Sequence, residues 1–222
     1  MRNTSLLIAL ALFTLTAACA EATAPEAPDA ALPPPTLREQ LARPVQLTVD
    51  PVASTGAVTA SEHAGAGWRP AHVALQVDAG TFSLTGRGSA LVLHAFEVDL
   101  APIALPMLPN DARLTDISVR LAGPVSVGVT WQDDDDAIVL ATLDLELDWS
   151  FAAAGAKLPL GHQHLPAVPL AITLHGEAGG ATGALALDQP GELWRWADLL
   201  ALADLSLQLP ASTAPGRLPG LR

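Results

Sequence analysis

The sequence predicts a mainly β protein, with one antiparallel domain of about ten strands and one late C-terminal helix. Apolar and polar residues alternate over many segments from Val45 onward, as in strands with one buried face. Glycine, proline and aspartate separate these short segments, which favours antiparallel pairing. Half of the 222 residues are apolar, so one sizeable core can be buried.

Each expected strand is a run in which alternate side chains are apolar. These runs begin at Val45, Val73, Phe82, Ile117, Val125, Val139, Leu170, Leu185 and Leu205. The run Val139–Phe151 is the longest, at roughly 43 Å for an extended chain, so we expect a bend or bulge in it. A sheet with one apolar face hides it in a sandwich, a barrel or a curled sheet, and all three remain open.

The late helix is expected to begin near Pro190, because proline suits a first helical turn. An apolar stripe follows at i, i+3, i+4 and i+7, formed by Leu193, Trp196, Ala197 and Leu200. The candidate ligand-binding residues are Trp194, Trp196, Leu193 and Leu200, bordering an apolar pocket under this helix. The alternative is a helix that only packs on the core.

The N-terminal residues are typical of a secretory signal. Arg2 is followed by the apolar stretch Leu6–Phe13 and then by Leu15-Thr16-Ala17-Ala18-Cys19. Cys19 is the only cysteine, so it forms no disulfide within the chain. The layout resembles the lipobox of bacterial lipoproteins, although Thr16 stands where that family usually has an aliphatic residue.

The resemblance implies that residues 1–18 are removed and that Cys19 is acylated, palmitate being one expected chain. The lipid would then anchor the protein in the cell envelope. In this family a non-acidic residue such as Ala20 after the cysteine implies an outer membrane lipoprotein, facing the periplasm or the surface. The alternative is ordinary signal peptidase cleavage, which releases a soluble periplasmic or secreted protein.

After the signal, residues 19–40 are expected to be the lipidated cysteine and a disordered Ala/Pro-rich tether. Residues 41–210 form the β-rich domain, and residues 211–222 form a flexible tail. Removal of residues 1–18 takes away only Arg2 among charged residues, so the formal charge changes from −12 to −13. An acidic surface repels phosphate backbones, so we expect no nucleic-acid partner.

Two groups of side chains have the chemistry of metal ligands. Asp133, Asp134, Asp135 and Asp136 offer oxygens to Ca²⁺, but their spacing does not match a calcium-binding loop, and a solvated hairpin tip is favoured. His162 and His164, in a proline-rich loop over residues 158–169, would need a third ligand for Zn²⁺ or Cu²⁺. We assign no metal site and no cofactor.

No phosphate-binding loop, dinucleotide motif or nucleophile elbow is present, so we predict that the protein is not an enzyme. The expected role is non-enzymatic binding in the envelope, with a lipid or other apolar molecule as the ligand. The alternative is a structural or partner-docking envelope protein with a filled core. An enzyme whose site is assembled from distant strands is the third hypothesis.

Overall fold

The computed structural model describes residues 33–64, 67–105, 108, 110–196 and 199–213, without the side chains of Ala64, Pro159, Leu160 and Trp196. Cys19 and the expected signal lie outside these residues, and every described helix and strand belongs to the compact unit Pro34–Arg222. The elements are α1 (Leu37–Leu41), β1 (Val45–Val49), β2 (Thr55–Ala64), β3 (Gly67–Leu75), β4 (Val77–Arg87), β5 (Ala90–Leu100), β6 (Ile103–Ala104), β7 (Arg113–Leu121), β8 (Val125–Gly128), β9 (Thr130–Trp131), β10 (Asp136–Ala153), β11 (Ala156–Glu177), β12 (Gly180–Trp196) and β13 (Leu200–Ser212).

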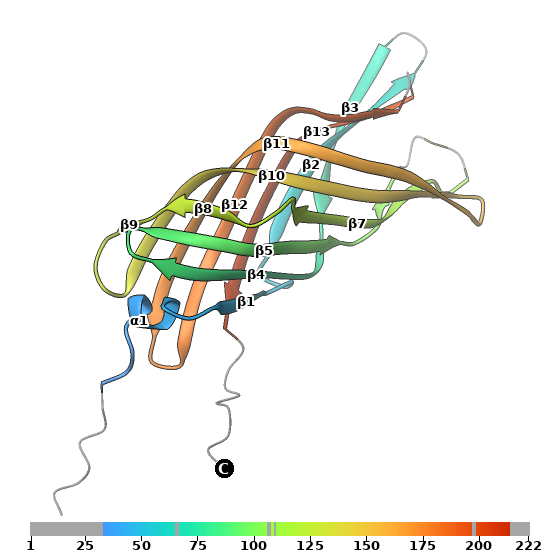
Figure 1. Cartoon of the computed structure of the whole chain (residues 1–222). Coiled ribbons are helices and arrows are strands. Elements are labelled where there is room, and N and C mark those ends of the chain that lie inside the picture. The colour runs from blue at the N-terminus through green and yellow to red at the C-terminus, as the bar shows by residue number, and fades with distance from the viewer. Residues whose placement is uncertain (1–32, 65–66, 106–107, 109, 197–198, 214–222) are drawn as a thin grey trace, which may run out of the picture. The chain divides into compact units, whose positions relative to one another are not determined.

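The strands form one antiparallel sheet that closes into a barrel (Figure 1). The ring follows the order β1, β4, β5, β7, β10, β11, β12 and β13, and β13 pairs back onto β1 through Val49 and Ala211. The strands β2 and β3 extend the barrel wall beyond this ring. Strand β2 follows β1 in the chain and also pairs with β13, and β3 pairs with β2. Thirteen strands are therefore described where about ten were expected, because several long strands are interrupted.

Apolar side chains fill the inside of the barrel. The predicted alternation of Val139–Phe151 is confirmed, since the odd-numbered residues from Leu143 to Phe151 on β10 are all buried. The predicted irregularity is also present, as the pairing of β10 with β11 shifts register after Leu143 and again after Trp149. Such shifts let a long strand bend around a closed barrel.

The prediction of a late C-terminal helix is wrong, because residues 180–196 form strand β12 and residues 200–212 form strand β13. The helical spacing has a different origin: Trp196 and Leu200 are paired across the β12–β13 hairpin. A hairpin brings apolar residues of two strands to one side, which imitates a helical stripe. Pro190 lies beside a bulge at Gly191, whose φ of 88° favours glycine.

The short helix α1 closes one end of the barrel (Figure 1). Thr36 caps it in a capping box with Glu39, and both Leu37 and Leu41 are fully buried. Residues 34–40, expected in the tether, thus belong to the compact unit, and β13 extends to Ser212, within the expected tail. Within the described residues, no helix has the length and apolar character needed to cross a membrane.

Candidate functional site

At the end away from α1, the barrel wall is incomplete. One edge of β3 pairs with β2, whereas the described residues show no backbone pairing between its other edge and β5 or β6. Next to this opening, the wall is joined by a backbone hydrogen bond in which the N–H of Ala101 donates to the carbonyl oxygen of Gln76 at 2.9 Å. We call this opening between β3 and β6 the seam.

A cavity of about 330 Å³ lies at the seam. Its lining comes from β2, β3, β6 and the residue after β6, namely Ala60, Glu62, Ala71, His72, Val73, Ala74, Ala104 and Leu105. Most of these side chains are small or apolar, and Glu62 adds a carboxyl group that is only 6% exposed. Its volume lies within the range of small-molecule sites, about 300–1,000 Å³.

A smaller interior void lies beside the seam cavity. It has about 30 Å³, room for one or two water molecules. It is lined only by apolar side chains, namely Val58, Leu75, Leu100, Ile103, Leu114, Ile117, Val119, Leu147, Trp149, Leu193, Leu202 and Leu205. The two hollows are adjacent, because Val58 of the interior void and Val73 of the seam cavity are paired across β2 and β3 and so lie on the same face of the wall.

The wall beside the interior void is irregular. Trp149 packs edge to face against Trp194, with ring centres 5.1 Å apart. Close to Trp194, the ladder between β12 and β13 is broken, and the N–H of Gly191 donates to Asp204 Oδ1 at 2.8 Å instead. Bulges of this kind are frequent next to binding sites and at barrel rims.

The structure does not bring the predicted ligand-binding residues together around one pocket. Leu193 lines the interior void, and half-buried Trp194 packs on Trp149. Leu200 is fully buried but is not among the lining residues of either hollow. The side chain of Trp196 lies outside the described residues. Sequence analysis missed Glu62 because β2 is rich in small and polar residues, which hide its alternation.

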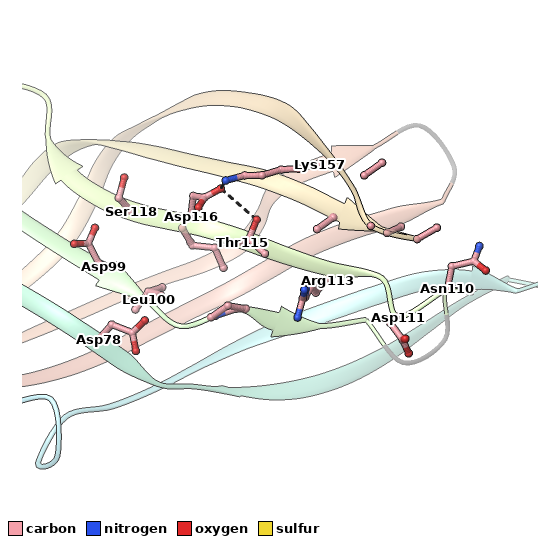
Figure 2. Close-up of a pocket in the computed structure, with 17 residues that line it drawn as sticks. Asp78, Asp99, Leu100, Asn110, Asp111, Arg113, Thr115, Asp116, Ser118 and Lys157 are labelled. Carbon is pink, nitrogen blue, oxygen red and sulfur yellow. Dashed lines mark hydrogen bonds and ion pairs between the residues drawn. The ribbon is translucent and has the colours of Figure 1, made fainter.

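A larger hollow is an open groove of about 1010 Å³ on the outer surface (Figure 2). Its charged side chains are Asp78, Asp99, Asp111, Asp116, Arg113 and Lys157. Lys157 and Asp116 form an ion pair, and the hydrogen bond from Lys157, followed by that from Ser150, lowers the pKa of Asp116. The lining includes no histidine or cysteine.

Asp133, Asp134 and Asp135 form the turn between β9 and β10, which holds helix α1, and Asp136 begins β10. Asp133 accepts hydrogen bonds from the N–H groups of Asp135 and Asp136, as in an Asx turn. Asp135 Oδ1 accepts the N–H of Leu37 at 3.1 Å, and Asp134 lies 3.8 Å from Arg38. These contacts of the turn are therefore structural.

His162 and His164 lie on the outer face of β11, which replaces the expected proline-rich loop. The strand tolerates Pro166 because a bulge shifts the register between Val168 and Leu165. His162 Nδ1 is 3.0 Å from Asp148 Oδ1, and the same carboxyl group also contacts Arg120. Among the described residues, no group of three or more His, Cys, Asp or Glu side chains is placed to hold a metal ion.

His175 should titrate above the ordinary histidine pKa of about 6.5. Its Nδ1 is 2.5 Å from Asp136 Oδ1, and that hydrogen bond, supported by the charges of Asp136, Glu177 and Asp135, raises the pKa. The pair therefore stabilises the fold fully below about pH 6.5, and the contribution is lost as the pH rises through the raised pKa. An NMR titration should show the pKa of His175 falling in Asp136→Asn. In the control, Asp134→Asn, it should hardly change.

The fold and the site define a closed, antiparallel eight-position barrel with an apolar interior, a helix across one end and a lateral seam at the other. No protein-family model, curated protein or solved structure matches this chain.

Proposed function

We propose that this chain is an exported envelope protein, acylated at Cys19, whose barrel binds a lipid or another apolar ligand without catalysing a reaction. The observation that carries the ligand-binding role is the seam cavity, about 330 Å³, beside an interior void with a wholly apolar lining. A site that is mostly apolar with few polar groups is typical of binding pockets for small apolar molecules.

The seam supplies a route for such a ligand. Adding an occupant between β3 and β6 breaks no backbone pairing that the described residues show. The interior void alone, at about 30 Å³, is too small for an acyl chain. Binding therefore requires side chains next to the void to move, and the interrupted ladder between β12 and β13 near Trp194 leaves fewer hydrogen bonds to oppose that movement than a regular ladder would.

A second function, the structural or partner-docking protein with a filled core, is favoured by the small volume of the interior void. Small barrels are commonly filled by their own side chains. This alternative differs from the first in a measurable way, since a filled core retains no apolar molecule.

The test is a titration of the full-length protein with Nile red, a neutral dye that fluoresces in apolar surroundings, together with mass spectrometry of a solvent extract. A ligand-binding barrel should give saturable fluorescence with one dye per chain, or release a lipid into the extract. A protein that binds no dye and yields a clean extract would contradict the proposal and support the filled core.

A pair of variants locates the dye. Ala71→Trp, opposite the buried Ala60, places a large side chain in the seam cavity and should weaken dye binding by about tenfold, because overpacking commonly costs about 1–3 kcal/mol. Ala95→Trp, on the exposed face of β5, should bind the dye like the natural chain. Both variants have the same N-terminal residues, so a difference in dye binding between them must come from the barrel. Equal binding by both would exclude the seam.

A further inference from the structure

We infer that the ligand of the barrel is an uncharged lipid with a neutral hydrogen-bond acceptor, such as an ester or amide carbonyl, beside its apolar chain. This inference rests on the proposed function and narrows its ligand class. It comes from the indole N–H of Trp149 and from the uncharged lining of the interior void.

Trp149 carries a buried donor that nothing described in the barrel satisfies. The residue is 4% exposed and lines the interior void, and its Nε1 has no hydrogen-bond partner among the described residues. A buried N–H without an acceptor is costly, and most such groups in proteins are paired. A donor left in this state beside a cavity indicates an acceptor that arrives with a ligand.

A ligand that reaches this donor must displace the side chains that cover it. The surface of the interior void is apolar throughout, so neighbouring side chains cover the N–H in this structure. Trp194 packs edge to face on Trp149 and lies next to the bulge of β12. A chain that widens the void has to displace such neighbours, and the same displacement uncovers the donor.

The uncharged lining of the interior void selects against an anionic ligand. The lining of the interior void includes no charged side chain, whereas the titratable groups of the seam cavity, Glu62 and His72, lie outside that lining. A ligand carboxylate entering the interior void would lose its water and meet no cation in the lining. A pure hydrocarbon would enter more easily, but it would leave the N–H of Trp149 without an acceptor.

The test compares three ligands of the same chain length, namely methyl oleate, oleate and the corresponding hydrocarbon, as competitors of Nile red on the full-length protein. Methyl oleate should displace the dye at a concentration about three- to tenfold lower than the other two, the range expected for one hydrogen bond. Equal competition by the ester and the hydrocarbon would overturn the inference, while the proposed function would survive.

Two variants assign the effect to the indole N–H. Trp149→Phe should remove the preference for the ester but keep dye binding. Trp131→Phe removes another indole Nε1 that has no partner among the described residues, is outside the lining of both hollows, and should keep the preference. A preference that survives in Trp149→Phe would overturn the inference.

A measurement on the natural chain covers the case in which Trp149→Phe does not fold. Isotope labelling of the tryptophans makes the indole N–H signals visible by NMR. Methyl oleate should move the Trp149 signal in the direction of a new hydrogen bond, and the hydrocarbon should not. The same shift with both ligands would contradict the inference, and a chain that binds no ligand would overturn the proposed function with it.

Discussion

Leu145→Ala should lower the free energy of unfolding by about 2–5 kcal/mol, whereas Leu140→Ala on the same strand should change it by less than about 0.5 kcal/mol. Leu145 is fully buried inside the barrel, and Leu140 is 76% exposed on the outside. The same atoms are deleted in both variants, so the difference measures the side of the wall on which each residue lies.

Urea unfolding followed by circular dichroism gives both values, provided that the slope of the transition is unchanged. Leu145 pairs with Leu121 on β7 and Leu165 on β11, so its deletion leaves a cavity where three strands meet. Comparable losses in the two variants would mean that β10 is buried on both faces, which a closed barrel with this interior does not allow.

Gly176→Ala should release helix α1 and lower the free energy of unfolding by about 1–3 kcal/mol. A Cβ atom at Gly176 would lie 2.9 Å from Leu37 Cβ and the same distance from Asp135 Oδ1, which is closer than real Cβ contacts. Because Leu37 is fully buried against this strand, the helix must shift away from the barrel.

Trypsin reports the release directly, since Arg38 lies in α1 and is followed by Glu39. Cleavage after Arg38 should become about tenfold faster in Gly176→Ala, in line with that loss of stability. Gly179→Ala is the matched control, because a Cβ at Gly179 meets no atom within 4 Å. If both variants are cleaved at the natural rate, α1 is not seated on Gly176.

Part of the candidate site could be predicted from the sequence. The alternation around Trp149 placed it among the inward-facing residues, and Leu193 was expected at an apolar pocket. The seam could not be predicted, because it depends on which strand lies next to β3 and on where that pairing stops. Strand order is a long-range property, and residues 55–72 have no clear apolar alternation to signal it.

The sequence by itself determined the β class, the antiparallel pairing and the buried face of β10, because alternation with period two is a local property of a strand. The acylated N-terminus stays a prediction. Only the tertiary structure showed that the sheet is a barrel and not a sandwich. It also showed that the residues of the expected late helix form the β12–β13 hairpin, and that α1 packs against Gly176. The physical reason is that closure, bulges and helix docking depend on contacts between residues far apart in the chain, which no local pattern records.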